Sequence, residues 1–313
     1  MPSLKVIRTR IVSVKSTQKI TKAMKMVAGA RLARAQQAIT ALRPYAVKTG
    51  EILQSVAGGA AADASAAGGA GVEALDESAT LHPLLARRAE GNVLIVLFSG
   101  DRGLCGAFNT NVNKAAERKW RELLAEGKKV SFVTAGRKGK EYLARRGATI
   151  VEDFPRPYEA LEIGKARAIA TTLTSKYKSK DFDAVYIVFN EFKSAMTQKA
   201  TLSQLLPLSP PAPGESQQGT GAAGAGDTEF LFEPDKKALL RSLVPMYLEV
   251  TLFRAMLESQ AGFFGAQMTA MDSATRNAKD MIKRLSLAYN RARQAAITKE
   301  LMEIIGGAEA LKE

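Results

Sequence analysis

Residues 4–42 read LKVIRTRIVSVKSTQKITKAMKMVAGARLARAQQAITAL, and this stretch decides the fold that the sequence predicts. Apolar or small side chains recur along it at steps that alternate between three and four residues. This heptad pattern is typical of a helix that pairs with another helix. Gln18 and Lys25 interrupt the pattern, and Pro44 is expected to end or kink the helix. The stripe consists of Leu4, Ile7, Ile11, Val14, Thr21, Ala28, Leu32, Ala35, Ile39 and Leu42.

A second stripe with the same spacing runs through the C-terminal part of the chain. Three polar residues, Gln260, Gln267 and Lys299, interrupt it, and the pair Gly306–Gly307 is expected to stop the helix. The stripe consists of Val250, Phe253, Leu257, Phe264, Met271, Ala274, Ala278, Met281, Leu285, Ala288, Ala292, Ala295 and Met302.

Both predicted helices are too long for a compact domain. At 1.5 Å per residue they would span roughly 60 Å and roughly 85 Å. The economical arrangement is an antiparallel two-helix coiled coil that joins the N- and C-terminal segments, because each helix then buries its stripe against the other. The alternative is a pair of ordinary core helices in a helical bundle.

The residues between the two helices show an α/β pattern, which predicts a central Rossmann-like domain with a largely parallel sheet. The chain is therefore divided into a helix at 1–56, a low-complexity stretch and linker at 57–91, an α/β domain at 92–206, a second low-complexity stretch at 207–228 and a helix at 229–313. Segments 57–79 and 207–228 are expected to be disordered. Strands are predicted at 92–98, 129–134, 148–151 and 183–189, helices at 107–126, 137–146 and 159–177, and an added edge strand or hairpin at 192–206.

The net charge and the numbers of cysteine and histidine residues limit the kinds of partner and site that the chain can have. The net charge is +14, and residues 1–50 hold eleven basic side chains and no Asp or Glu, which predicts an anionic partner or an acidic protein surface. Cys105 and His82 are the only cysteine and histidine, so an internal disulfide, a cysteine metal cluster and a histidine-based triad are excluded. We expect Cys105 to be a small buried group and His82 to be exposed in a loop. No apolar stretch approaches the ~18 residues needed to span a bilayer.

The sequence SGDRGLCGAFN at residues 99–109 raises the question of a nucleotide site, because its glycines follow a predicted strand. The spacing of Gly100, Gly103 and Gly106 fits neither the dinucleotide fingerprint nor the phosphate-binding loop, and no lysine lies where that loop needs one. Asp101 and Cys105 have no histidine to work with. We therefore predict a tight turn between a strand and a helix, with no catalytic, cofactor or metal site, and keep a nucleotide site as the alternative.

Three stretches resemble the gamma subunit of F-type ATP synthases. They are IRTRIVSVKSTQKITKAMKMVAGARLARAQ at 7–36, SGDRGLCGAFN at 99–109 and MDSATRNAKDMIKRLSLAYNRARQAAITKELMEIIGGAEAL at 271–311. The resemblance covers nearly the whole chain apart from the two low-complexity stretches. It implies a rotor without an active site or cofactor, whose paired terminal helices form a shaft and whose α/β domain forms a foot.

The same resemblance implies a set of partners. The shaft would turn inside a hexamer of alternating alpha and beta subunits, and the foot would rest with the epsilon subunit on the membrane ring of c subunits. Proton flow would turn the ring and the shaft, and ATP would be made on the beta subunits. The subunit would be peripheral to the membrane, on the cytoplasmic face of a bacterial inner membrane, and would bind no nucleic acid.

The resemblance also implies roles for individual residues. Met24 and Lys25 match the N-terminal motif and are expected to contact a beta lever segment, while Leu301, Ile304 and Ile305 would form an apolar bearing tip. Arg293, Gln294 and Thr298 match the C-terminal motif, where polar contacts to a beta loop are implied. The foot-domain turn holds Gly100, Asp101, Arg102, Gly103 and Gly106.

One stretch departs from the family pattern. QAGFFGAQM at residues 260–268 replaces a charged stretch with two phenylalanines and two glycines, which changes both packing and charge. Two rival functions stay open on the sequence alone. A basic helical hairpin could bind nucleic acid, although no aromatic platform accompanies its charges, and the central domain could belong to a dinucleotide-dependent enzyme.

Overall fold

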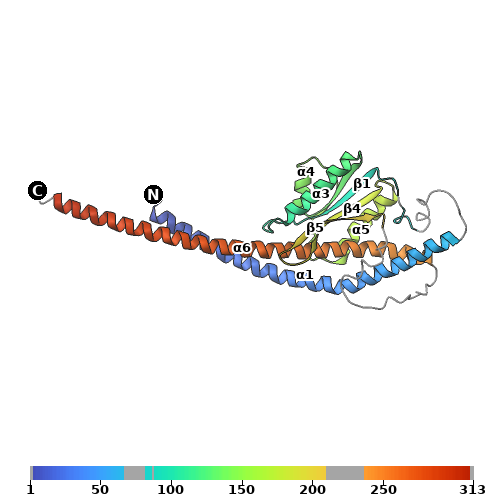
Figure 1. The fold of residues 1–313 in the computed structure, drawn as a ribbon, viewed down its shortest axis with the longest axis horizontal. Helices are drawn as coiled ribbons and strands as arrows, with labels where there is room; N and C mark the ends of the chain where they lie inside the picture. Colours follow the sequence, from blue (N-terminus) through green and yellow to red (C-terminus); the bar gives the residue numbers. More distant parts are fainter. Residues whose placement is uncertain (1–2, 67–81, 87, 209–235, 311–313) are drawn as a thin grey trace. The chain divides into compact units, whose positions relative to one another are not determined.

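The structure, a computed structural model, describes residues 3–66, 82–86, 88–208 and 236–310. The chain divides into two compact units, one made of residues 1–30 and 267–313 and the other of residues 31–266. Helices α1 (Leu4–Ala66) and α6 (Lys236–Ala310) each contribute to both units (Figure 1).

The first unit contains the predicted antiparallel helix pair. The hydroxyls of Thr21 and Thr275 lie 2.8 Å apart, and Lys25 Nζ lies 2.5 Å from Asp272 Oδ1. Rising residue numbers on α1 therefore meet falling numbers on α6. Apart from Met24, which is also half-buried, the buried and half-buried side chains of α1 in this unit keep the steps of three and four without a break, and Gln18 and Lys25 belong to the stripe. These side chains are Leu4, Ile7, Ile11, Val14, Gln18, Thr21, Lys25 and Ala28.

On α6 the predicted stripe holds as far as Ala278, and beyond it only Leu285 and Ala292 are half-buried as predicted. After this residue one step of three becomes a step of four, so Met281 is 52% exposed and Ile282 takes its place. The expectation was therefore wrong for Met281, and also for three exposed residues farther along, Ala288, Ala295 and Met302.

Helix α1 does not end at Pro44, where the sequence predicts an end or a kink, and α6 does not end at Gly306–Gly307. Helix α1 continues through Pro44, which is exposed, so water can bind the carbonyl group that the proline leaves without a donor. It also includes residues 57–66, expected to be disordered, where alanine has the highest helix propensity. Helix α6 continues through Gly306–Gly307, because nothing there requires a positive φ angle. Residues 67–79 and 209–228 lie outside the described residues.

The second unit is built on a five-stranded sheet in the order β3-β2-β1-β4-β5. Four strands are parallel, and β5 pairs antiparallel with β4 as the predicted edge strand. The bounds are β1 (Asn92–Phe98), β2 (Lys129–Ala135), β3 (Ile150–Phe154), β4 (Ala184–Phe192) and β5 (Gln198–Leu206), with helices α3 (Phe108–Ala125), α4 (Arg137–Ala144) and α5 (Ile163–Lys178) between them. The predicted α/β domain is confirmed.

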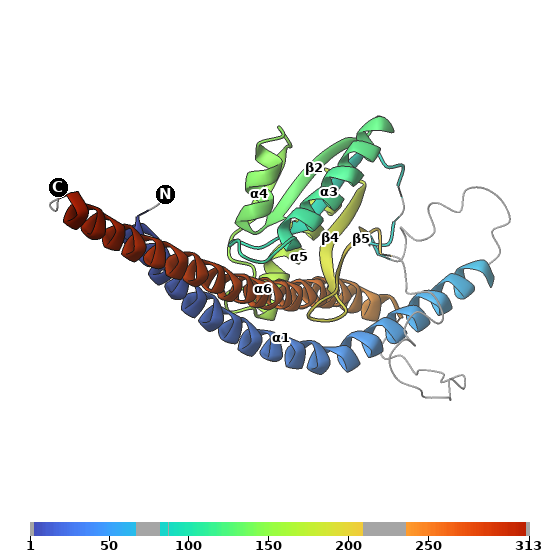
Figure 2. The same cartoon turned by 60° about the vertical axis from the view of Figure 1, so that its left-hand side comes forward.

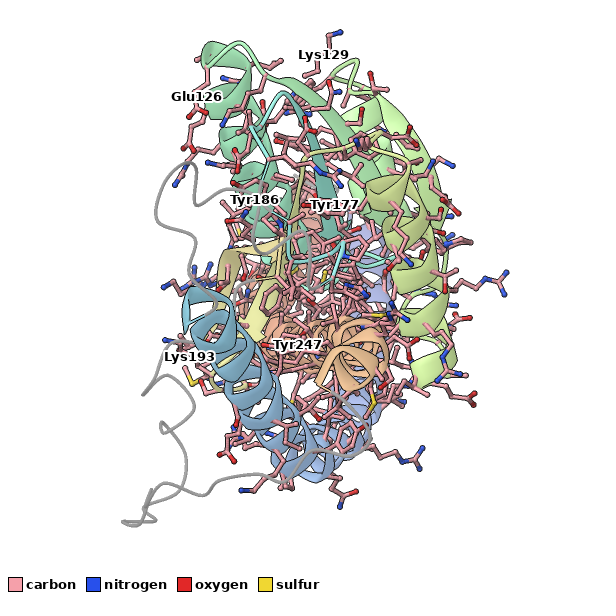
Figure 3. All side chains as sticks on the ribbon, turned by 90° about the vertical axis from the view of Figure 1, so that its right-hand side faces the viewer. Glu126, Lys129, Tyr177, Tyr186, Lys193 and Tyr247 are labelled. Atoms are coloured by element: carbon pink, nitrogen blue, oxygen red, sulfur yellow. The ribbon has the colours of Figure 1, made fainter. Side chains whose placement is uncertain are left out.

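Two apolar cores cover the two faces of this sheet. Alternate residues of β1 separate between them, since successive side chains of a strand point to opposite faces. Val93, Ile95 and Leu97 join the core under α3 and α4, whereas Leu94, Val96 and Phe98 join the core shared with α5 and α6. Residues 240–256 of α6 thus act as a covering helix of the domain. In Figure 3, Tyr177 lies in the interior of this unit, and Glu126 and Lys129 lie at its outer edge.

His82 was expected to be exposed, and this is wrong. It is only 5% exposed, and its Nδ1 accepts a hydrogen bond of 3.2 Å from the backbone N–H of Leu84. The adjoining Leu84 and Leu85 belong to the core shared with α5 and α6. Burial, together with the positive charges of Lys178 and Arg241, lowers the pKa of His82 below its ordinary value of 6.5.

Protonation of His82 is therefore expected to destabilise the sheet unit. Because the pKa is lower in the folded state, the unfolded chain binds the proton more readily, so stability is complete above pH 6.5 and falls as the pH drops below it. Thermal unfolding of the full chain at a series of pH values measures this loss. His82→Asn keeps an acceptor but cannot titrate, so its melting temperature should fall less between pH 7 and 5.5, values that bracket about 6.5. Equal slopes for both chains would contradict the prediction.

Candidate functional site

The candidate site lies at the carboxyl ends of β1 and β4. Strands β2 and β3 follow on one side of β1, and β4 lies on its other side, so the order of the sheet reverses between β1 and β4. In doubly wound folds a ligand binds at this reversal, in the crevice outside the carboxyl ends of the strands. The turn at residues 99–109 follows β1 at this position. A nucleotide bound in the usual place of such folds would therefore contact this turn.

Polar groups of the turn satisfy one another. The side-chain oxygen of Asn109 accepts a hydrogen bond of 2.9 Å from the N–H of Gly100, and its amide nitrogen donates to the carbonyl of Arg102 at 3.2 Å. The same nitrogen lies 3.2 Å from the sulfur of Cys105, which is buried as expected. Burial raises the pKa of the Cys105 thiol, which makes it a poorer nucleophile near neutral pH.

Asp101 occupies the positions where a phosphate group could bind. Its Oδ1 accepts hydrogen bonds from the backbone N–H groups of Arg137, at 3.1 Å, and Arg156, at 3.2 Å. Arg137 is the first residue of α4, and the amino end of a helix is a favourable place for an anion. The carboxylate of Asp101 therefore occupies the anion position at the amino end of α4.

The three glycines of the turn serve different purposes. Gly106 has a positive φ of 55°, a conformation that glycine adopts at little cost. A Cβ added at Gly103 would meet nothing within 4 Å. A Cβ added at Gly100 would lie only 2.7 Å from Cε2 of Phe263. Gly100 is therefore required by a close neighbour from α6 and not by a ligand.

Phe263 fills the crevice at the strand reversal. Its ring centroid lies 5.5 Å from that of Phe108, at 78°, and 5.7 Å from that of Tyr158. Edge-to-face ring pairs of this kind add about 0.5–1.5 kcal/mol to the effect of burial. The glycines on either side of the Phe263–Phe264 pair let α6 approach closely, since a Cβ at Gly262 would lie 3.3 Å from Phe108 and one at Gly265 would lie 3.3 Å from Ala195.

Two hydrogen bonds, one buried and one partly buried, fix this part of α6 to the sheet domain. The N–H of Asn190, near the end of β4, donates to Ser259 Oγ at 3.1 Å, and Ser259 is fully buried. Gln260 Nε2 donates to the carbonyl of Tyr158 at 3.0 Å. The unusual QAGFFGAQM stretch is thus the segment that closes the crevice, and the turn at 99–109 is a packing surface for it.

The helix pair of the first unit contains the predicted contact residues Met24 and Lys25. It places Lys25 against Asp272, a residue that the sequence did not single out. Lys25 forms an ion pair with Asp272, and Arg276 Nη2 lies 3.1 Å from the other oxygen of that carboxylate. The hydrogen bond and the charge of Lys25 lower the pKa of Asp272. Met24 is half-buried beside Lys25. Lys25 thus holds the two helices together within this chain.

The predicted contacts near the C-terminus are all exposed in the isolated chain. Arg293, Gln294 and Thr298 lie on the surface of α6. The pairing of Thr21 with Thr275 places the start of α1 opposite the region of residue 293, so α6 beyond it has no partner among the described residues. The tip residues Leu301, Ile304 and Ile305 are 52%, 72% and 51% exposed. Large apolar side chains exposed in such a group mark a protein interaction site.

The residues that the structure describes contain neither a candidate metal site nor a candidate membrane span. They contain no cluster of three or more His, Cys, Asp or Glu side chains suited to a metal ion. Within the same ranges, no helix combines the length and the apolar character needed to cross a membrane.

Sequence reasoning missed the residues that form the closed crevice. Phe264 was placed in the apolar stripe, but Phe263 and Ser259 were given no role. The doublet of phenylalanines between two glycines, at a point where the family pattern is charged, was the available signal. It indicated altered packing without indicating the partner, because Gly100 and Phe263 are far apart in the sequence.

Comparison with known proteins gives consistent results along the whole chain. A family model described as ATP synthase matches residues 3–311. A relative from Sorangium cellulosum named ATP synthase gamma chain is 52% identical, and one of the same name from Geotalea uraniireducens is 46% identical. Both alignments cover all of this chain and all of the relative.

Solved structures show the same fold at much lower identity. A chain of the Euglena gracilis mitochondrial ATP synthase, in a structure described as OSCP/F1/c-ring, matches with a TM-score of 0.62 and 19% identity over 98% of this chain and 94% of that one. A chain of the central stalk and c-ring structure from Tetrahymena thermophila matches with a TM-score of 0.54 and 19% identity, over 82% of this chain and 99% of that one.

The contact between Gly100 and Phe263 predicts unequal effects of two similar substitutions. Gly100→Ala should lower the free energy of unfolding by about 1–3 kcal/mol, as overpacking of a core does. Gly103→Ala is the matched control, because its Cβ meets no atom within 4 Å. Urea unfolding measures both. In a Phe263→Ala background the cost of Gly100→Ala should largely disappear, and an unchanged cost would show that the two sites are independent.

Proposed function

Because the chain belongs to the family of ATP synthase gamma chains, we propose that it acts as a rotor whose helix pair turns inside a hexamer of alpha and beta subunits. It is the non-catalytic rotor subunit of the central stalk of an F-type ATP synthase. In the complex it couples proton-driven rotation to ATP synthesis and hydrolysis on other subunits. The full-length identity of 52% to a named gamma chain carries this conclusion.

The closed crevice supports a role without catalysis. Phe263 occupies the place where a doubly wound fold would bind its ligand, and Asp101 occupies the amino end of α4. Both the nucleotide site and the dinucleotide-dependent enzyme that the sequence left open would need that space. Fold and function separate here, since a nucleotide-binding architecture is used as a rigid support.

Within this function we propose a division of the chain into foot and shaft. Residues 92–206 form the foot, which would rest with an epsilon subunit on the ring of c subunits at the cytoplasmic face of a bacterial inner membrane. Residues 1–56 and 229–313 form the shaft. The exposed apolar tip supports this assignment, because α6 has an unpaired end whose side chains a surrounding sleeve of subunits would cover.

We also propose contact roles for the polar residues near each end of the shaft. Arg293, Gln294 and Thr298 are exposed and available to a loop of a beta subunit. Met24 and Lys25 would meet an acidic lever segment of a beta subunit. Since Lys25 already pairs with Asp272, an acidic segment that approaches it would compete with or extend this ion pair.

Co-expression with the alpha and beta subunits of a bacterial synthase tests the proposal. We expect one copy of this chain in each alpha–beta hexamer, measured by native mass spectrometry. A chain that stays outside the hexamer, and instead binds duplex DNA tightly at physiological salt, would favour the nucleic-acid alternative. In that case the affinity would fall steeply with rising salt concentration.

The tip gives a sharper test by substitution. Ile304→Asp should leave the free energy of unfolding of the isolated chain unchanged within about 0.5 kcal/mol, because the side chain is exposed. It should nevertheless reduce the yield of the assembled hexamer. Ala278→Asp is the contrasting variant, since Ala278 is buried in the helix pair and a buried charge destabilises the chain itself. Normal assembly with Ile304→Asp would contradict the role of the tip.

A further inference from the structure

The two adjacent phenylalanines of α6 connect three parts of the sheet unit. Phe263 points into the sheet domain, where it meets Gly100, Phe108 and Tyr158. Phe264 lies on a different side of the helix, and the guanidinium carbon of Arg31 on α1 lies 5.6 Å from its ring centroid. The sheet domain, α6 and α1 therefore meet at neighbouring residues.

The remaining contact between α6 and the sheet is of a different kind. Residues 240–256 present aliphatic side chains such as Leu240, Val244 and Leu248 to the core. Apolar burial of this kind is favourable but not directional. The ion pair between Arg167 and Glu249, at 3.1 Å, has a largely exposed Arg side chain, and such pairs contribute little.

The segment at residues 259–265 has the directional contacts. The Phe263 ring occupies the space that the missing Cβ of Gly100 leaves, and the hydrogen bonds of Ser259 and Gln260 on the same helix lead to β4 and to Tyr158. Rotation of α6 about its own axis would break both hydrogen bonds and would drive the ring against the backbone of the turn. Close-packed interiors resist such deformation.

We propose that Phe263, seated against Gly100, is a positioning residue that transmits torque between the helix pair and the sheet domain. Phe264 extends this joint to α1 through Arg31. The inference rests on the rotor function of the chain. It adds that the joint lies at the closed crevice, so the architecture that would hold a nucleotide in an enzyme holds the shaft here.

The test uses the complete synthase in membrane vesicles, with variants of this chain. ATP hydrolysis is measured by phosphate release and proton uptake by a pH-sensitive dye. For Phe263→Ala we expect hydrolysis to continue while the protons moved per ATP fall roughly twofold or more, because a joint that slips lets hydrolysis proceed without transmitting the rotation. Phe263→Leu, which keeps most of the apolar volume, should recover part of this ratio.

Phe132→Ala is the matched control. Phe132 is fully buried against Trp120 on the opposite face of the sheet, so its loss destabilises the domain without touching the joint. It should lower the melting temperature of the chain and leave the ratio of protons to ATP at the wild-type value. An equal loss of coupling in both variants would reduce Phe263 to a stability role and overturn the proposal.

The outcomes separate the joint from the rotor function. A wild-type complex that hydrolyses ATP without moving protons would contradict the rotor function itself. A wild-type complex that pumps, together with Phe263→Ala pumping equally well, would overturn the joint alone. If Phe263→Ala prevents assembly, Phe263→Leu and Gly100→Ala decide, because both should assemble and both should lower the ratio relative to Gly103→Ala.

Discussion

The structure depends on one helix that must satisfy two different neighbours. Residues 240–265 of α6 cover a face of the sheet, and residues 267–292 of the same helix pair with α1. Packing on the sheet requires side chains that fit its face and the crevice, whereas pairing with α1 requires a regular stripe of apolar or small side chains along α6. The helical backbone has the same period along the whole of α6. The two parts of the helix can therefore fit different neighbours only through different side chains. The Gly262–Gly265 stretch directly precedes the boundary between the two units at residues 266 and 267, inside a helix that Figure 2 shows as continuous.

This constraint explains what fills the strand reversal of this Rossmann-like domain. Such a crevice is concave, partly apolar and bordered by backbone N–H groups, which are the features that ligands use. The same features suit an aromatic side chain and a carboxylate supplied by the chain itself. Phe263 and Asp101 meet those needs internally. Of the glycines that resemble a phosphate cradle, Gly100 is required by close packing and Gly106 by turn geometry.

The sequence predicted the sheet domain well, because each of its signals is local. A continuous apolar run marks β1 as a central parallel strand, and the other strands and helices begin and end within a few residues of their expected positions. The stripe on α1 is equally local. It failed on α6 only beyond Ala278, where Met281, Ala288, Ala295 and Met302 are exposed while Leu285 and Ala292 stay half-buried.

The wrong predictions have a common origin: they depend on contacts between distant parts of the chain, which the spacing of residues in the sequence does not show. Pro44 and Gly306 are unfavourable inside a helix, yet α1 and α6 continue through them. His82 is buried by residues of α5 and α6 that come much later in the sequence. The seat of Phe263 against Gly100 is likewise a contact between distant segments. Family resemblance supplied the contact residues near both ends of the shaft, and spacing alone would have left them as exposed side chains.

The positive charge of the first unit completes the physical argument. Of its basic residues before Ala28, only Lys25 has an ion-pair partner within the described residues, and Lys5, Arg8, Arg10, Lys15, Lys19 and Lys22 have none. Like charges on neighbouring turns of a helix repel, so the isolated helix pair carries a cost that falls with rising salt concentration. An acidic surface around the pair, as proposed for the beta subunits, would remove that cost. On that proposal, the helix pair would be more stable inside its partners than alone.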